Sequence, residues 1–308
     1  MKALLDTFLE PDDRVFLPFL TSAALIAAVV WWFCVRGHGR SLLGYLFPRE
    51  IFLHRSARLD YALLVVRALV RTLGIVPRFV TTVGVAVLVA RALRVQFGPT
   101  RPHAAPVALL FTLAAFLVDD LGRYLVHRAM HRFSFLWQLH QVHHSAEVLT
   151  PFTLHRVHPL ESLLMSLRGV VGLGLVTGLF MWLFPGRVRG YWVLGVDVVG
   201  FALAALGGNL RHSHVWLSYG VWLERWFISP AQHQIHHSRD PQDHDRNFGA
   251  GLAVWDWVFG TLRLAGPRRR LRFGLAEPNH GPGLASALVD PLRAWGRSES
   301  RSEVDVRV

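Results

Sequence analysis

Cysteine is nearly absent from this sequence: among 308 residues there is only Cys34, inside an apolar run. One thiol cannot form a disulfide framework or a metal site built on several thiolates, so we expect Cys34 to be a small buried apolar residue. The Gly-x-Gly-x-x-Gly fingerprint of dinucleotide-binding turns is also missing. Any redox reaction of this chain would therefore need electrons from a separate carrier.

Charge is scarce as well: charged residues make up 18% of the chain and apolar residues 52%. Mean hydropathy is positive, at +0.32. Soluble proteins carry more charge, and several apolar runs approach the roughly 20 residues that cross a bilayer, so the composition predicts an integral membrane protein. The net charge of +12 would also suit a nucleic-acid-binding protein. Arginines beside apolar runs favour lipid headgroups instead, and we expect no nucleic-acid partner.

The apolar runs predict an all-α fold: an integral membrane helical bundle with a helical cap on its cytoplasmic face. The predicted spans are residues 15–35, 79–97, 105–121, 163–184 and 190–208. Residues 61–76 carry Arg67 and Arg71 on one helical face, which favours a helix lying in the membrane interface. The first 14 residues hold four acids and two bases. That is the wrong charge for a cleavable signal, so the first span should remain as an anchor.

Loop charge predicts the orientation in the membrane. Residues 36–60 are rich in arginine, which places this loop in the cytoplasm and the acidic N-terminus outside. The chain would cross the membrane outward through the run 163–184 and return through the run 190–208. The histidine-rich stretches on either side of this hairpin, and the C-terminus, would therefore lie in the cytoplasm. If residues 61–76 crossed the membrane instead, both stretches would lie outside.

Histidine is abundant and clustered: thirteen of the seventeen histidines fall within residues 127–158 and 212–244. Residues three and four apart share a helix face, so each short motif aims its imidazoles in one direction. The motifs are HxxxH at His127 and His131, and HxxHH at His140, His143 and His144 and again at His233, His236 and His237. Ser229 and Pro230 suit the start of a helix that carries the last motif.

Three such motifs favour a metal site, because neutral imidazole is the commonest protein ligand for transition metals. A single histidine would more often be an ordinary surface or core residue. Eight imidazoles exceed the four ligands of a tetrahedral zinc and suit two metals of higher coordination number. No acidic ExxH pattern of the carboxylate di-iron bundles accompanies them. Asp119 and Asp120 either hold a ligating ring through its N–H or form an ion pair with Arg123.

The segments HRAMH, LWQLHQVHHS, RVHPLE and SPAQHQIHHS, followed by NFGAGLAVWDWVFGT, resemble the fatty acid hydroxylase/sterol desaturase superfamily. Members are integral membrane enzymes that use O2, two electrons and a histidine-rich di-iron centre at the cytoplasmic face to hydroxylate or desaturate lipids. The resemblance implies two iron ions and no catalytic residue beyond the metal centre. The implied ligands are His127, His131, His140, His143, His144, His212, His214, His233, His236 and His237. Many relatives have Asn at the place of His214, and His158 would either ligate or support the site.

The resemblance covers roughly residues 105–265 and divides the chain into three regions. Residues 1–104 would form a membrane anchor region, residues 105–265 a fatty acid hydroxylase-type catalytic domain, and residues 266–308 a basic, partly disordered tail. Within the closing motif, four residues are expected to shape a turn that docks the last helix under the site: Asn247, Gly249, Asp256 and Gly260.

The resemblance also implies an external electron-transfer protein. Arginines of the predicted cytoplasmic face would dock an acidic carrier of this kind, or would only attract lipid headgroups. These arginines are Arg211, Arg225, Arg239, Arg246, Arg263 and Arg268–Arg270.

The main hypothesis is a membrane-bound, O2-dependent di-iron oxygenase that hydroxylates or desaturates a sterol-like or fatty-acyl lipid. A metal-binding or metal-transporting membrane protein is the alternative, and it would need polar groups along its spans. The runs 15–35, 79–97 and 163–184 contain no acids or histidines. A non-catalytic lipid-binding relative would lack a motif histidine, and none is missing.

Overall fold

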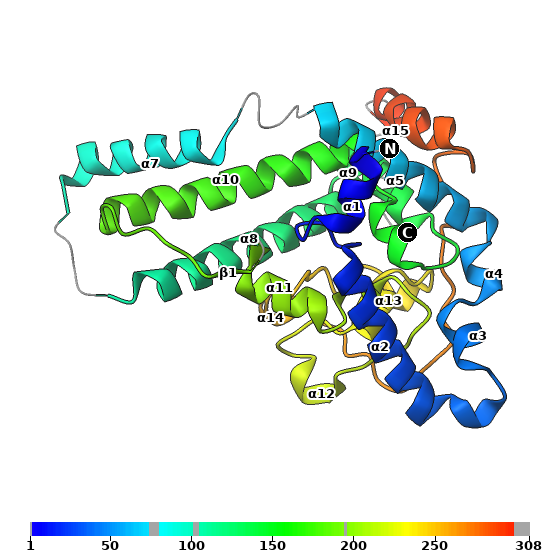
Figure 1. The fold of residues 1–308 in the computed structure, drawn as a ribbon. Coiled ribbons are helices and arrows are strands. Elements are labelled where there is room, and N and C mark those ends of the chain that lie inside the picture. Colours follow the sequence, from blue (N-terminus) through cyan, green and yellow to red (C-terminus); the bar gives the residue numbers. More distant parts are fainter. Residues whose placement is uncertain (1, 74–79, 101–104, 194–195, 299–308) are drawn as a thin grey trace.

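The computed structural model describes residues 2–73, 80–100, 105–193 and 196–298. Helices dominate this part of the chain, and its one sheet pairs the two-residue strands β1 (Trp192–Val193) and β2 (Val196–Asp197). Figure 1 shows an elongated arm of three helices, with a body of further helices and loops at one end of it. The prediction of a helical fold is confirmed.

The arm consists of α7 (Thr82–Phe97), α8 (Val107–Arg132) and α10 (Pro159–Leu183). Helix α8 runs opposite to α7 and α10 (Figure 1). Apolar side chains spaced along one face of α8 meet α10 in a buried cluster of Val107, Phe111, Ala115, Val176 and Phe180. This seam fixes the direction in which the last turns of α8, with their two histidines, enter the body.

Two glycines let α7 approach α10 closely. A Cβ atom on Gly174 would lie 2.6 Å from the Cβ of Val85, and one on Gly178 would lie 2.6 Å from the carbonyl oxygen of Ala86. The glycines are four residues apart and so share one helix face. This is the small-xxx-small packing that membrane helices use to bring backbones together.

The body is assembled from the other helices, which precede the arm, follow it or lie between α8 and α10 in the sequence. They are α1 (Lys2–Leu9), α2 (Leu17–Cys34), η1 (Arg36–His38), α3 (Leu42–Leu46), α4 (Arg49–Phe52), α5 (Arg55–Leu73), α9 (Ser134–His144), η2 (Pro151–His155), α11 (Val198–Ala205), η3 (Gly208–Arg211), α12 (Gly220–Leu223), α13 (Pro230–His236), η4 (Pro241–Asp243), α14 (Val254–Val258) and α15 (Leu284–Ser298).

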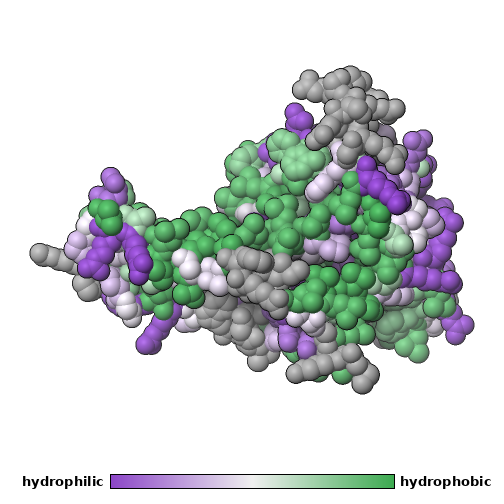
Figure 2. Space-filling model, turned by 90° about the horizontal axis from the view of Figure 1, so that it is seen from above, coloured by the Kyte–Doolittle hydropathy of each residue, from purple (hydrophilic) through white to green (hydrophobic). Residues whose placement is uncertain are grey.

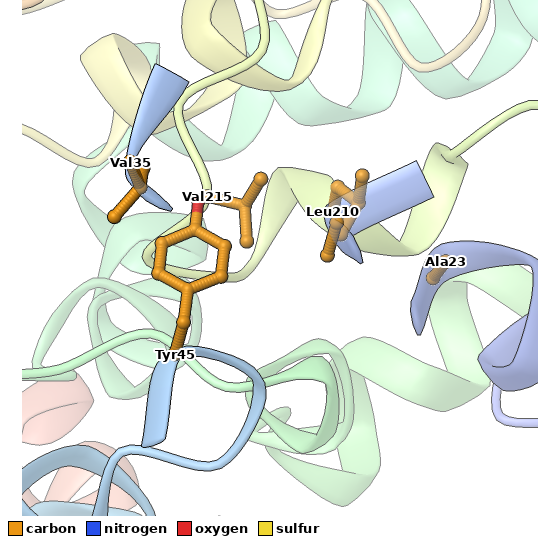
Figure 3. Packing of buried hydrophobic residues seen from close by; sticks show 6 residues of the cluster. Ala23, Val35, Tyr45, Leu210 and Val215 are labelled. Atoms are coloured by element: carbon orange, nitrogen blue, oxygen red, sulfur yellow. The ribbon is translucent and has the colours of Figure 1, made fainter. Parts of the chain in front are cut away.

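Helix α2 runs across the direction of the arm (Figure 1) and packs on the segment that contains His212. In Figure 3, Ala23 lies beside Leu210, while Val35 and Tyr45 face Val215. The chain on both sides of His212 is therefore held by buried apolar contacts, although it forms no long helix of its own.

Two described helices are long and apolar enough to cross a membrane, α2 and α10, as predicted for residues 15–35 and 163–184. The helix predicted within residues 79–97 is α7, which has 16 residues and includes Arg91 and Arg94. The helix predicted within residues 105–121 is longer than expected, because α8 continues to Arg132.

The span predicted for residues 190–208 is wrong. This run contains β1, β2 and the eight-residue helix α11, which is only about 12 Å long. Asp197 starts α11 by accepting hydrogen bonds from the backbone N–H groups of Val199 (2.9 Å) and Gly200 (3.1 Å). Gly207 follows its end with a positive φ of 99°. An apolar sequence is thus divided by one capping carboxylate and one glycine turn.

Helix α5 contains most of the predicted interfacial helix, whose last residues lie outside the described part of the chain. Its two arginines have protein partners. Arg67 lies 2.5 Å from Asp13, and Arg71 lies 2.5 Å from Glu10 and 2.8 Å from Asp12. The arginine-bearing face of α5 therefore meets the acidic N-terminal segment, which accounts for these charges without lipid headgroups.

The N-terminal acids lie at the histidine end of the molecule. Asp13 is fully buried, and its Oδ1 is 3.2 Å from Nε2 of His155. The sequence placed this segment across the membrane from the histidines, so the structure differs from that prediction. Burial of an aspartate beside arginine and histidine partners could not be foreseen from loop charge.

Part of the predicted tail is folded. Ala287 of α15 packs against Leu59, Leu63 and Val142 in a buried cluster. Residues 299–308, where the sequence predicts disorder, lie outside the described part of the chain. The expectation that Cys34 is buried is wrong, because it ends α2 with its side chain exposed.

The surface is apolar along much of the molecule. Figure 2 shows hydrophobic residues running from the arm onto the body, with hydrophilic residues gathered at the tip of the arm and at the opposite side of the body. Many large apolar side chains are exposed, among them Leu88, Val95 and Phe33. An apolar zone between polar ends is the surface expected of a protein that associates with a membrane.

Candidate metal centre

Nine of the ten histidines proposed as ligands converge in the body. They come from the end of α8, from α9, from the residue after η3 and from α13 with its C-cap. Helix α13 starts as predicted, because Ser229 accepts from the N–H of Gln232 and Pro230 occupies the first turn. Two groups form, with one ring nitrogen of each member within 4.8 Å of the others: His127, His131, His140, His144 and His236, and His143, His212, His233 and His237.

The nitrogen–nitrogen distances point to a cation inside the four-histidine group. Nε2 of His212 lies 3.2 Å from Nε2 of His143, 3.1 Å from that of His233 and 3.1 Å from that of His237. One ring nitrogen carries a single proton or a single lone pair, so it cannot make three hydrogen bonds at once. Around a metal with bonds of about 2.1 Å, neighbouring ligand nitrogens lie roughly 3.0–3.4 Å apart. The donor set therefore fits a metal ion.

The five-histidine group is held from outside by hydrogen bonds to Nδ1. Nδ1 of His127 lies 2.9 Å from the carbonyl oxygen of Phe248, and Nδ1 of His236 lies 2.7 Å from that of Arg246. Nδ1 of His140 lies 2.8 Å from Oε1 of Glu161. A carbonyl can only accept, so Nδ1 of His127 and His236 carries the proton. The Nε2 atoms of all three rings are buried without a protein partner, which leaves their lone pairs for a metal.

Burial favours the neutral form of most of the converging imidazoles. Burial, followed by neighbouring imidazoles, lowers the pKa of four rings well below 6.5: His143, His144, His233 and His237. Burial lowers the pKa of His212 and of His236 to about 3, and Arg211 adds to the effect at His212. Neutral rings at physiological pH are the form that binds metals.

The closing motif supports the site through its backbone. Asp256 is fully buried, and its carboxylate accepts from the N–H groups of Phe248 and Gly249, both at 2.8 Å. This holds the Phe248 carbonyl against His127. Asn247, at a positive φ of 57°, donates to the carbonyl of Gln232 in α13 and accepts from the N–H of Arg263. Burial raises the pKa of Asp256 to about 6.

Glu161 is a supporting residue that the sequence reasoning missed, although it lies in the HPLE segment beside His158. Replacing Glu161 with alanine is expected to weaken metal binding about 10- to 100-fold, because His140 loses the partner that orients its ring. Metal affinity of the purified protein by competition with a chelator measures this. Glu147→Ala removes a carboxylate that is 44% exposed and pairs with Arg55, so it should leave affinity unchanged. Equal affinities of the two variants would contradict the assignment.

Several residues considered from the sequence lie outside the two groups. Nε2 of His214 is 2.7 Å from the carbonyl oxygen of Tyr45. His158 caps α10 and its Nε2 is 3.0 Å from the carbonyl oxygen of Leu288. Asp119 pairs with Arg123, the second of its two predicted roles. Asp120 holds no histidine: it accepts from the N–H of Leu252 and from the indole of Trp255.

A cavity of about 740 Å³ opens beside the histidines. Five of the nine converging histidines line it. Its other walls come mainly from α8, α10, α11 and η3 and from the segments 11–14 and 248–251. The apolar part of the wall includes Phe19, Phe116, Met165, Leu173 and Leu203. Its volume lies within the range of sites that bind small molecules.

Several known proteins with related sequences are named as lipid-modifying enzymes. The ornithine lipid hydroxylase of Rhizobium tropici is 26% identical over 201 residues, which cover 64% of this chain and 55% of that protein. The alkylglycerol monooxygenase of Homo sapiens is 29% identical over 54% of this chain and 33% of its own. A very-long-chain aldehyde decarbonylase of Oryza sativa subsp. indica is 29% identical over 48% of this chain and 53% of that protein. The chain thus spans between a third and about half of these relatives.

No solved structure matches the chain significantly. The fatty acid hydroxylase family model matches residues 112–261. That segment contains all nine converging histidines, Glu161 and the closing motif. Over these residues, just under half of its length, the chain matches the fatty acid hydroxylase family, as its histidine motifs predicted.

Proposed function

We propose that this protein is a membrane-associated di-iron oxygenase that hydroxylates a lipid. The observation that carries the proposal is the convergence of nine imidazoles, seven of them buried, in two groups beside a partly apolar cavity. His127, His131, His140, His144 and His236 would hold one iron, and His143, His212, His233 and His237 the other. Iron bound there would supply the reduction of O2 and the oxidation of a C–H bond.

The protein's own part is to place a lipid and to keep water away. Apolar side chains of α2, α8, α10 and α11 line the cavity and suit a hydrocarbon chain. Carbonyl groups and Glu161 fix the rings before substrate arrives, so ligand positions need not change during turnover. The names of the hydroxylase and monooxygenase relatives support lipid hydroxylation.

The histidine end is proposed to face the cytoplasm, where an external electron carrier would reach it. Arg225, Arg239, Arg246, Arg268 and Arg270 are exposed and would be available to an acidic carrier. Arg211 does not belong to this set, because it is buried in the cavity wall. Arg263 and Arg269 both pair with Asp243.

The test is lipid profiling of cells that express the chain, with isotopically labelled dioxygen and with a His143→Ala variant as the matched control. A lipid that gains one labelled oxygen atom only with the intact chain supports hydroxylation. Loss of two hydrogens would instead indicate desaturation, and loss of one carbon from an aldehyde would indicate decarbonylation. Identical lipid profiles of the two cell lines, with both proteins present in the membrane, would reject oxygenase activity on cell lipids.

A further inference from the structure

The cavity is lined by charged residues as well as apolar ones, and most of these charges are paired. Arg123 and Arg168 both bind Asp119, at 2.7 and 2.8 Å. Arg67 binds Asp13. Asp120 accepts hydrogen bonds from the backbone N–H of Leu252 and from the indole of Trp255. The nearby carboxylates are therefore already engaged.

Arg14 and Arg211 remain without a carboxylate partner. Among the described residues, no carboxylate oxygen lies within 4.0 Å of either guanidinium. The side chain of Arg14 makes no hydrogen bond to this part of the chain; only its backbone carbonyl is used, by Asn209. Arg211 is buried, donates to the carbonyl of Ala250, and leaves its Nε buried without a partner. Burial lowers the pKa of Arg14 and of Arg211; Asp119 and Asp120 partly offset this at Arg14, and Asp120 at Arg211, but neither carboxylate forms an ion pair with these arginines. The two cations in the cavity wall are therefore only partly compensated, and an anion bound between them would stabilise them.

Both guanidinium groups lie near the four-histidine group. Arg211 directly precedes His212, and Arg14 and Arg211 line the same cavity as His143, His212 and His233. Burial, then Arg123 and Arg211, lowers the pKa of Arg14 to about 9. Arg14 is therefore still protonated at neutral pH and still attracts an anion.

We infer that the cavity binds its lipid by an anionic headgroup, a carboxylate or a phosphate, through Arg14 and Arg211. This inference rests on the proposed function and specifies its substrate class. The planar guanidinium donates paired hydrogen bonds to either kind of oxyanion. Phe19, Phe116 and Leu173 in the same wall would contact the hydrocarbon part. A small inorganic anion would leave this apolar wall uncovered, so an amphiphile fits the cavity better.

Equilibrium binding tests the inference without turnover. The full chain in a neutral maltoside detergent is titrated by calorimetry with laurate, dodecyl phosphate and 1-dodecanol, which share one chain length. At least one anionic lipid should bind roughly tenfold or more tightly than the alcohol, because hydrogen bonds to charged groups are the stronger ones. Whichever anion binds more tightly identifies the headgroup.

Variants then locate the contact. Arg14→Gln should reduce the advantage of the anion over the alcohol to about twofold or less, and Arg14→Lys should keep most of it because the charge remains. Arg58→Gln is the control, since Arg58 is an exposed arginine of α5 that does not line the cavity. The lysine variant and a thermal melt keep the test valid if the glutamine variant folds poorly.

The outcomes separate the two proposals. If laurate and dodecyl phosphate bind no better than 1-dodecanol, or if Arg14→Gln keeps the preference, the headgroup inference is wrong while the lipid cavity stands. If none of the three binds the intact chain, the cavity is no lipid site, and the proposed function fails with the inference.

Discussion

Replacing His143 with alanine is expected to lower the turnover rate roughly a thousandfold or more and to remove metal from the four-histidine group. His143 is buried, and its Nε2 lies 3.2 Å from that of His212. Its loss leaves three imidazoles to hold one ion. Losing a residue that merely orients a ligand already costs about 10- to 100-fold, so losing a ligand should cost more. Metal content after anaerobic iron loading and product formation are the two measurements.

His214→Ala is the matched control. His214 lies two residues from His212, but its ring bonds to the Tyr45 carbonyl and packs edge-on against the Tyr45 ring, 5.2 Å between centroids. This variant should keep about two irons per chain and most of the activity. Full metal content in His143→Ala would remove that residue from the ligand set. Loss of metal in His214→Ala would return His214 to it.

The histidine motifs could be interpreted from sequence because their geometry is local. Residues three and four apart on a helix share a face whatever the tertiary fold, so His140, His143 and His144 had to point together. The start of α13 was equally local, since Ser229 and Pro230 act within one turn. The sequence could not predict how the nine rings divide between the two groups. His143 and His144 are neighbours in the chain, yet they belong to different groups.

One failure was local. Hydropathy counted residues 190–208 as one apolar run, although Asp197 and Gly207 interrupt it. The others came from long-range contacts. Loop charge placed the N-terminal acids outside, although Asp13 is buried against Arg67 and His155. Both contacts of Asp13 join segments more than fifty residues apart. Glu161 was missed for the same reason, because its partner His140 is twenty-one residues away on another helix.

The largest effect on stability is expected from Asp60→Ala. Asp60 of α5 is fully buried, and its Oδ1 accepts from Arg156 at 3.0 Å. Arg156 is itself buried and also donates to the carbonyls of Ser56 (2.9 Å) and Val142 (2.9 Å). It therefore joins α5 to the end of α9, directly before His143. Removing the carboxylate leaves a buried guanidinium without its counter-charge, which costs about 3–5 kcal/mol.

For a chain of this size, that loss corresponds to a fall in melting temperature of roughly 5–10 °C, measured by thermal unfolding of the purified protein in detergent. Glu50→Ala provides the comparison. It removes a carboxylate 3.7 Å from Arg40, in a pair whose side chains are 58% and 63% exposed. Exposed pairs of this kind contribute about 0–1 kcal/mol, so its melting temperature should change by no more than about 2 °C. Equal melting temperatures for the two variants would mean that Arg156 finds another partner, and that the link between α5 and α9 does not depend on this ion pair.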